Sequence, residues 1–306
     1  MKGFGGPEVL EIAELDPPEL QPGALLLKTL ACGINPIDVK IRRGTNFVCR
    51  KRQGDPFPWT LGFDICGIVE DPGTQHRFKK GDRVFGFAGD PIHPDACATD
   101  ALAFPERLYK IPKNSDPVQF AALPIAGSTA LTILEYLDPS RPHIIVSGAT
   151  GGVGHLLLQI LKSKGFEITA LSSPKSAEYA LECGASAVYD YHQGLPPQLW
   201  QNFDVVVDMQ GGSYGISLYH CLKPDGIMLT VPTITAIQVM AAAPQGIKAV
   251  GIRSRNSAEH LKILADMVKK GTLKPRIAKV LQLDEAVKAH QLIEEGHTMG
   301  KIVLVP

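Results

Sequence analysis

The 306-residue sequence has no long uncharged apolar run and no charge imbalance, and its first residues lack the features by which we would expect a secretory leader. No stretch approaches the roughly eighteen uncharged apolar residues that a transmembrane helix needs, so we expect no membrane span. Lysine plus arginine equals aspartate plus glutamate, at 31 each. This zero formal charge gives no support to a nucleic-acid partner or to an anionic membrane surface. The N-terminal residues 1–7 also lack the apolar core of a signal peptide.

Cysteine is scarce, with six residues, and no two of them form a Cys-x-x-Cys pair. They are Cys32, Cys49, Cys66, Cys97, Cys183 and Cys221. Most of them lie in apolar or helical surroundings. This pattern fits reduced thiols in the cytoplasm better than a disulfide framework or a zinc knuckle.

The sequence divides into two regions that differ in composition and in the order of predicted strands and helices. Residues 1 to about 117 are rich in glycine, proline and short apolar runs, with strands predicted at 25–30, 65–70 and 83–87, which indicates a β-rich, barrel-like domain. From about 118 to 255, strands alternate with helices, which predicts a parallel, doubly wound sheet. The strands predicted there are 144–146, 168–171, 187–189, 205–208, 227–231 and 248–252. The predicted fold class is therefore α/β.

After residue 255 the pattern predicts two helices and a last strand, at 258–270, 284–295 and 302–305. Asp284 is the predicted N-cap of the second of these helices. We expect this tail to return and pack on the first domain. The predicted domains are thus 1–117 with 256–306, and 118–255.

A glycine-rich turn follows the strand at 144–146 and leads into an apolar helix. It reads Gly148-Ala149-Thr150-Gly151-Gly152-Val153-Gly154. This is the layout of a dinucleotide-binding turn, although Ala149 replaces the first glycine of Gly-x-Gly-x-x-Gly. Free N–H groups at the helix start would receive the pyrophosphate, which assigns residues 149–153 to the cofactor. The alternative is a tight strand–helix turn without a ligand.

The end of the next strand indicates which dinucleotide binds. An NAD site usually has a carboxylate there to hold the ribose 2′-hydroxyl. This sequence has Ser172, Ser173 and Lys175 instead, and no carboxylate before Glu178. Hydroxyls and a cation suit a 2′-phosphate, so we predict NADP(H) over NAD(H). The alternative is that Lys175 is an ordinary surface lysine.

Several further motifs resemble one family over nearly the whole chain. They are Phe-Gly-Gly-Pro at 4–7, Gly-Ile-Asn-Pro-Ile-Asp at 33–38, Lys-Lys-Gly-Asp-Arg-Val at 79–84, Ala-Ala-Leu-Pro at 121–124 and the ending at 296–304. With the glycine turn, they resemble the medium-chain dehydrogenase/reductase superfamily, and within it the zinc-independent quinone oxidoreductase (ζ-crystallin-like) group.

The resemblance implies a GroES-like β-rich catalytic domain and a Rossmann cofactor domain. It also implies NADPH-dependent reduction of a small-molecule quinone or activated enone, commonly in a homodimer or homotetramer, of which we expect the homodimer. Three alternatives stay open: an enoyl-thioester reductase, an alcohol dehydrogenase-like activity, and a non-catalytic NADPH-binding sensor. Some relatives bind RNA, but the neutral charge does not support this here.

The resemblance also addresses zinc. Zinc-dependent relatives place a ligand cysteine where this chain has Asn35 and a ligand histidine where it has Phe63. A catalytic zinc needs about three protein ligands of S, N or O type. We therefore expect no zinc and no other metal.

The remaining site residues are carried over from the family. The resemblance places Asn35 and Asp38 beside the nicotinamide and substrate, and Thr129 near the nicotinamide or its ribose. Lys40 is the candidate cation that polarises the substrate, with Asp38 fixing it or a water. The alternatives are a plain turn before a helix for Asn35 and a surface position for Lys40. The other implied cofactor contacts are Tyr191, Val231, Pro232, Gly251, Ile252 and Lys301.

One departure concerns residues 97–100. Relatives often have Tyr-Ala-Glu-Tyr there, whereas this chain has Cys-Ala-Thr-Asp. The segment borders the active site in relatives, so we expect a different substrate shape.

Overall fold

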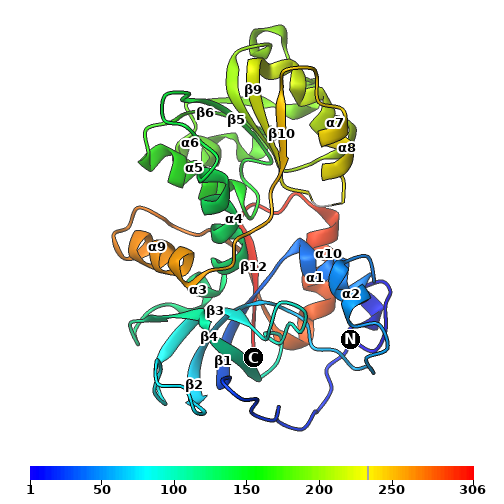
Figure 1. Cartoon of the computed structure of the whole chain (residues 1–306), viewed down its shortest axis with the longest axis vertical. Helices are drawn as coiled ribbons and strands as arrows, with labels where there is room; N and C mark the ends of the chain where they lie inside the picture. Colours follow the sequence, from blue (N-terminus) through cyan, green and yellow to red (C-terminus); the bar gives the residue numbers. More distant parts are fainter. Residues whose placement is uncertain (233) are drawn as a thin grey trace. The chain divides into compact units, whose positions relative to one another are not determined.

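The computed structural model describes residues 1–232 and 234–306, which form two structural units (Figure 1). Six parallel strands form the sheet of one unit. This unit comprises Thr129–Arg255 and Lys270–Lys274. The other comprises Met1–Ser128, Asn256–Lys269 and Pro275–Pro306. The boundary predicted from the sequence, 117/118, lies closer to the N-terminus than the division of the structure between Ser128 and Thr129.

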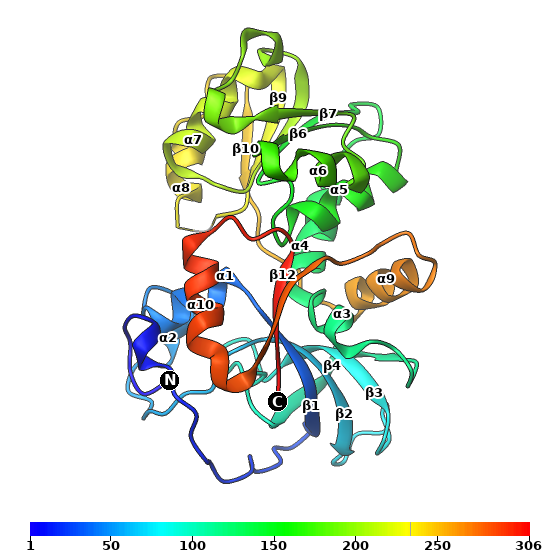
Figure 2. The ribbon, with the colours of Figure 1, turned by 180° about the vertical axis from the view of Figure 1, so that it is seen from behind.

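The parallel sheet has the order β10-β9-β8-β5-β6-β7. Its strands are β5 (His143–Ser147), β6 (Glu167–Ser172), β7 (Ala187–Asp190), β8 (Phe203–Asp208), β9 (Leu222–Thr230) and β10 (Lys248–Gly251). The central strand β8 is buried along its whole length, as its apolar run predicts for a sheet covered on both faces. Helices α5 (Gly154–Ser163) and α6 (Ala177–Cys183) cover one face, and α7 (Gly212–Ser217) and α8 (Ala236–Ala241) cover the other (Figures 1 and 2).

This order is that of a doubly wound dinucleotide-binding sheet, with β5 as its first strand. The strand order reverses between β5 and β8, because β6 and β7 follow on one side of β5 while β8 to β10 follow on the other. Ligands of such sheets bind at the carboxyl ends of the strands beside that point. The loop that follows β8 contacts the end of β5 there, because the backbone N–H of Met209 donates to Ser147 Oγ at 2.9 Å. The predicted Rossmann fold is confirmed.

The other unit is built on a strongly bent sheet that is antiparallel except for the parallel pair of β11 and β12. Its strands are β1 (Leu25–Ile34), β2 (Asp64–Asp71), β3 (Arg83–Ala88), β4 (Asp100–Ile111), β11 (Ile277–Gln282) and β12 (Lys301–Val305). The order is β11-β12-β1-β2-β3-β4, and β1 also pairs with β4, which closes four strands into a barrel. Apolar side chains of β1, β2, β4 and β12 fill its interior. The predicted β-rich, GroES-like domain is confirmed.

Short helices complete both units. They are α1 (Pro36–Arg42), α2 (Phe47–Lys51), α3 (Pro117–Ala121), α4 (Pro124–Leu134), α9 (Ala258–Lys269) and α10 (Ala286–Glu295). The prediction that Asp284 caps the second tail helix is wrong. Asp284 lies inside a 3-10 turn, Leu283–Glu285, because Glu285 Oε2 accepts the N–H of Gln282 at 3.0 Å and tightens the chain before α10 begins. Among the described residues, none of the helices has the length and apolarity needed to cross a membrane.

Helix α1 is anchored to α10, beside which it lies in Figure 2. The fully buried Arg42 donates from Nη2 to Glu294 Oε1 at 2.5 Å and from Nε to the carbonyl of Gly5 at 3.1 Å. Arg42 Nη1 also lies 3.3 Å from His290 Nδ1. Burial, aided by the Arg42 charge, lowers the pKa of His290 to about 4, so this imidazole stays neutral. The anchor fixes the helix that begins at the first candidate site residue, Asn35.

Candidate active site

Strand register brings three distant polar residues together in the barrel unit. Gly33 on β1 pairs with Asp64 on β2, and Ile34 pairs with Ile302 on β12. Asn35 follows Ile34 directly, and Lys301 directly precedes Ile302. The side chains of Asn35, Asp64 and Lys301 are therefore neighbours, and we name them the Asn35 cluster.

Hydrogen bonds join the three side chains of the Asn35 cluster to one another and to the backbone. Asn35 Nδ2 donates to Asp64 Oδ2 at 2.8 Å and, more weakly, to the carbonyl of Gly33 at 3.4 Å. Lys301 Nζ donates to Asn35 Oδ1 and, at 2.9 Å, to the carbonyl of Ile34. Asp64 Oδ1 accepts the N–H of Ile125 at 2.9 Å. Both Nδ2 hydrogens of Asn35 are thus engaged, while its Oδ1 has capacity for a second donor.

Two charges in the Asn35 cluster are almost completely buried. The exposed fractions are 0% for Asp64 and 3% for Lys301, and Lys301 Nζ lies 3.6 Å from Asp64 Oδ2. Burial raises the pKa of Asp64, and the nearby Lys301 ammonium opposes that rise. Burial likewise lowers the pKa of Lys301, against the attraction of Asp64 and Asp38. Each charge is therefore tolerated because the other is present.

Asp38 supports the same loop from inside α1. It is fully buried, and its Oδ2 accepts the backbone N–H of Asn35 at 2.8 Å, which closes the start of the helix. Burial raises the pKa of Asp38 to about 7, although the hydrogen bond from Asn35 and a nearby N–H of Gly62 lower it. Asp38 thus changes protonation near neutral pH.

Lys40 lies on α1 two residues beyond Asp38 and is half-buried. Residues two apart on a helix do not face each other, so the suggestion that Asp38 fixes Lys40 gains no support from this geometry. Burial lowers the pKa of Lys40.

The glycine turn of the parallel-sheet unit links β5 to the start of α5. Gly148 adopts a φ of +60°, and the N–H of Gly151 returns to its carbonyl at 3.0 Å. Within the part of the chain that the structure describes, the N–H groups of Gly152 and Val153 donate to no protein acceptor. These are the unpaired donors expected at a helix start.

Two glycines of the turn have different surroundings. A Cβ on Gly154 would lie 2.3 Å from the carbonyl oxygen of Gly148 and 2.7 Å from the Ala149 backbone. A Cβ on Gly151 would meet only the carbonyl oxygen of Gly148, at 3.3 Å. Gly154 therefore permits close packing of helix on strand, while Gly151 leaves open space on the outer side of the turn.

The predicted 2′-phosphate residues follow each other at the carboxyl end of β6. Ser172 is buried, and Ser173 Oγ lies 3.0 Å from Ser176 Oγ. Lys175 is exposed in a 3-10 turn, Pro174–Ser176, and forms no ion pair with any described residue. No carboxylate occupies the end of β6 itself.

Most other predicted cofactor residues lie along the same edge of the sheet. Tyr191 follows β7 and packs near Tyr214, with ring centroids 6.4 Å apart. Val231 and Pro232 follow β9, while Gly251 ends β10 and Ile252 follows it. Thr129 is buried on α4. Lys301 differs, because its ammonium group is enclosed in the Asn35 cluster.

Sequence reasoning missed two carboxylates that shape these sites. Asp64 holds Asn35, as described above. Asp208, at the end of β8, accepts the N–H groups of Gln210 and Gly211 and the hydroxyl of Thr230, at 2.8–2.9 Å. Both residues are fully buried. A carboxylate at one end of an apolar strand was the sequence pattern that could have identified them.

Asn35 and Phe63, which stand where zinc-dependent relatives are expected to have ligands, have no metal-ligand surroundings among the described residues. Phe63 packs in an apolar cluster with Ile41, Trp59 and Leu61. Over residues 1–232 and 234–306, no three side chains of His, Cys, Asp or Glu are grouped so that they could hold a metal ion.

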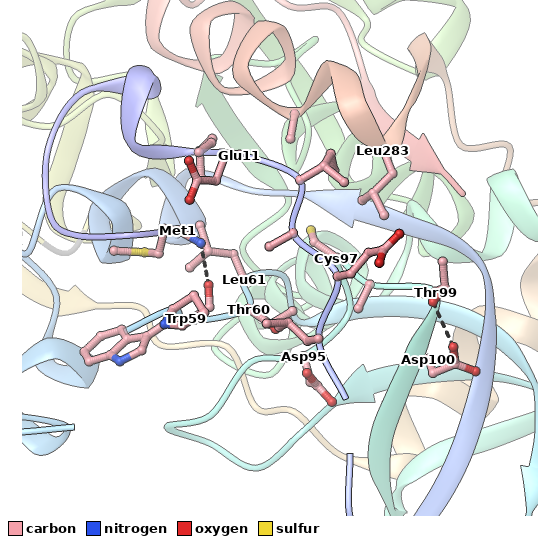
Figure 3. A pocket seen from close by; sticks show the side chains of 18 of the residues that line it. Met1, Glu11, Trp59, Thr60, Leu61, Asp95, Cys97, Thr99, Asp100 and Leu283 are labelled. Atoms are coloured by element: carbon pink, nitrogen blue, oxygen red, sulfur yellow. Dashed lines mark hydrogen bonds between the residues drawn. The ribbon is translucent and has the colours of Figure 1, made fainter. Parts of the chain in front are cut away.

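A pocket of about 590 Å³ lies in the barrel unit (Figure 3). Its lining comes from the segments 10–18, 58–61 and 95–100, with Met1, Leu283, Ala286 and His290. None of the predicted site residues lines it, so it is separate from the Asn35 cluster and from the glycine turn.

Two family models match the chain. The alcohol dehydrogenase GroES-like domain matches residues 21–106, and the zinc-binding dehydrogenase family matches residues 183–304. Each match falls on a region that carries part of the sites described above.

Individual relatives cover nearly the whole chain. The quinone oxidoreductase of Rattus norvegicus is 30% identical over 99% of this chain and 95% of its own length. The 2-methylene-furan-3-one reductase of Solanum lycopersicum is 30% identical over 99% of this chain and 77% of its own length. Among solved structures, the quinone oxidoreductase from Coxiella burnetii has a TM-score of 0.95 at 34% identity, covering 100% of this chain and 97% of that one.

Proposed function

Because this chain belongs to the quinone oxidoreductase family of the medium-chain dehydrogenase/reductase superfamily, we propose that it reduces quinones or activated enones with NADPH and without zinc. Membership makes the chain an NAD(P)H oxidoreductase. The preference for NADPH, the acceptor class and the independence from zinc form the proposal.

The observation that carries the proposal is the Asn35 cluster. At the position where zinc-dependent relatives have a ligand cysteine, this chain has an amide held between a buried carboxylate and a buried ammonium group. A divalent ion bound at Asn35 would be repelled by Lys301, and Phe63 offers no ligand atom. The cluster therefore supports hydride transfer without a metal.

The glycine turn fits a dinucleotide. Gly152 and Val153 would donate their free N–H groups to the pyrophosphate at the start of α5, beside Ala149 and Thr150. The open space over Gly151 would admit the phosphate oxygens. When bound, NADPH supplies the hydride from its nicotinamide ring, and the protein supplies position and polarity.

The end of β6 supports NADPH over NADH. Lys175 is exposed and has no competing ion pair among the described residues, so it can turn to a 2′-phosphate at little cost. The hydroxyls of Ser172 and Ser173 would add hydrogen bonds. A carboxylate at this place would repel the phosphate, and β6 ends without one.

The hydrogen bonds of Asn35 favour a contact with the cofactor over a contact with the substrate carbonyl. Because both Nδ2 hydrogens are used, Asn35 would hold the cofactor through the free capacity of Oδ1 rather than donate to the substrate carbonyl. Lys301 would act by orienting this amide. The other cofactor contacts remain as proposed from the family: Thr129, Tyr191, Val231, Pro232, Gly251 and Ile252.

Two residues of α1 are proposed to serve the acceptor side. Lys40, half-buried with a lowered pKa, would place a cation near the carbonyl oxygen that becomes negative during reduction. Asp38 would keep the Asn35 backbone in place. We also propose, from the family alone, a homodimer located in the cytoplasm.

The alternatives differ in what they consume. An enoyl-thioester reductase would prefer thioesters to quinones, an alcohol dehydrogenase would need zinc, and a sensor would bind NADPH without turnover. Purified protein should oxidise NADPH in the presence of 1,2-naphthoquinone or 9,10-phenanthrenequinone. Metal analysis of the same active sample should find no stoichiometric zinc. Tight NADPH binding without turnover across quinones and enones would support the sensor instead.

A further inference from the structure

Two thiols of the barrel unit lie in direct contact. Cys32 Sγ is 3.6 Å from Cys97 Sγ, although 65 residues separate them along the chain. Cys32 is buried on β1, and Cys97 is partly exposed in the segment between β3 and β4. A disulfide has an S–S distance of about 2.05 Å, so closing the pair requires an approach of about 1.5 Å.

The backbone on both sides of this thiol pair is well anchored. Cys32 pairs with Ile65 on β2 and with Leu304 on β12. The N–H of Cys97 donates to the carbonyl of Leu61 at 2.8 Å. The sulfur contact is therefore fixed by the fold.

Cys97 also lines the pocket of about 590 Å³, where Figure 3 shows it among the lining side chains. Carbon atoms of Leu10, Leu61 and Leu283 contribute to the same lining. A small neutral oxidant that enters this pocket can reach the sulfur of Cys97, whereas Cys32 is buried and does not line the pocket.

We propose that Cys32 and Cys97 form a reversible disulfide, and that a small hydroperoxide entering the pocket is the oxidant. The Cys97 thiolate attacks the peroxide O–O bond, which gives a sulfenic acid and releases an alcohol or water. The Cys32 sulfur then attacks the sulfenic sulfur, forms the S–S bond and expels water. Overall, the two thiols lose two protons and two electrons, and the peroxide takes up both to give an alcohol or water and one further water.

The surroundings of Cys97 set the expected rate. The hydrogen-bonded contact with Cys32, followed by burial, raises the pKa of Cys97 well above its usual value. Since the thiolate is the nucleophile, the reaction is slow at neutral pH. Its rate should rise about tenfold for each pH unit while the thiol stays mostly protonated.

The test uses the full chain, reduced, desalted and incubated with hydrogen peroxide at pH 7 and pH 9. Free thiols, counted after denaturation, should fall from six to four, faster at pH 9, and dithiothreitol should restore them. Peptide mapping should find one cross-link, between Cys32 and Cys97.

Variants separate this pair from other cysteines. Cys97→Ser and Cys32→Ser should show no intramolecular cross-link. Cys66→Ser is the matched control: this buried thiol on β2 has a pKa raised to about 12 by burial, and its loss should leave the cross-link intact. If Cys32→Ser fails to fold, Cys97→Ser and the wild-type peptide map still decide.

Two results would overturn the inference. One is oxidation of the wild-type protein at pH 9 without a Cys32–Cys97 peptide. The other is the same two-thiol loss in Cys97→Ser. Neither result depends on whether the chain reduces quinones.

Discussion

Replacing Lys301 by methionine removes one charge of the Asn35 cluster while keeping most of the side-chain volume. Asp64, with an exposed fraction of 0%, then loses its counter-charge, and Asn35 and Ile34 each lose a donor. Breaking a buried ion pair by removing one partner typically costs about 3–5 kcal/mol. We expect Lys301→Met to lower the free energy of unfolding of the barrel unit by that amount at pH 7.

The pH dependence of this loss follows from Asp64. Burial raises the pKa of Asp64 and Lys301 opposes the rise, so without Lys301 the carboxyl takes up a proton at higher pH. A protonated Asp64 needs no counter-charge. The difference between variant and wild type should therefore shrink from pH 7 to pH 5.

The assay is urea unfolding followed by tryptophan fluorescence. The chain has 2 tryptophans: Trp59 is buried in the barrel unit, and Trp200 is exposed in the other unit. In a Trp200→Phe background, Trp59 reports on the barrel unit alone, which matters because two units need not unfold together.

Two further variants complete the experiment. Lys279→Met removes an exposed lysine from β11, which pairs with β12, and should change stability by less than about 0.5 kcal/mol. The double variant Asp64→Asn with Lys301→Met should recover part of the loss, because neither charge of the Asn35 cluster remains. A Lys301→Met protein within about 1 kcal/mol of wild type at pH 7 would refute the reasoning.

Three other predictions concern the cofactor and Asp38. Lys175→Ala should weaken NADPH binding by about five- to tenfold at low salt and leave NADH binding unchanged, as measured by titration calorimetry. Lys164 is an exposed lysine at the far end of α5, and Lys164→Ala should change the binding of neither cofactor. Equal losses for both cofactors would contradict the 2′-phosphate assignment. Gly151→Ala should keep the fold by circular dichroism but lose NADPH binding, while Gly154→Ala should lower the melting temperature, because only its Cβ meets backbone at 2.3 Å; a stable Gly154→Ala protein would contradict this packing. Burial raises the pKa of Asp38 to about 7, so between about pH 4 and pH 7 the native state keeps a proton that the unfolded chain has lost. The contribution of Asp38 to the free energy of unfolding should therefore fall as pH rises through this range, by at most about 1.4 kcal/mol per pH unit. Asp38→Asn should remove this pH dependence in urea titrations.

The parallel-sheet unit was largely predictable from sequence. Most of its strands contain a short apolar, β-branched run, and the predicted ranges overlap β5 to β10. The start of β9 was predicted five residues late, because Lys223, Pro224, Asp225 and Gly226 interrupt its apolar run. The barrel unit was harder to predict. Strand β4 was missed because Pro105, Glu106 and Arg107 interrupt its alternation of apolar and polar residues. Strand β11 was missed because it is mostly exposed and shows no regular alternation of buried and exposed residues.

The candidate site divides in the same way. The glycine turn is one short segment, and Ser172, Ser173 and Lys175 lie in another. Local sequence pattern was therefore enough to find both. The Asn35 cluster depends on the register between β1, β2 and β12, which joins residues up to 266 positions apart. Sequence pattern predicts that a strand exists but not which residues it pairs with, so the contact of Lys301 with Asn35 was not foreseen.

Hydride transfer is the central claim, and isotope transfer tests it most directly. NADPH carrying deuterium on the transferable position of its nicotinamide would be mixed with the metal-analysed protein and an activated enone, and the product examined by mass spectrometry. We predict one deuterium per product molecule from protein that contains no zinc. A product without deuterium, or transfer that appears only after zinc is added, would contradict the account.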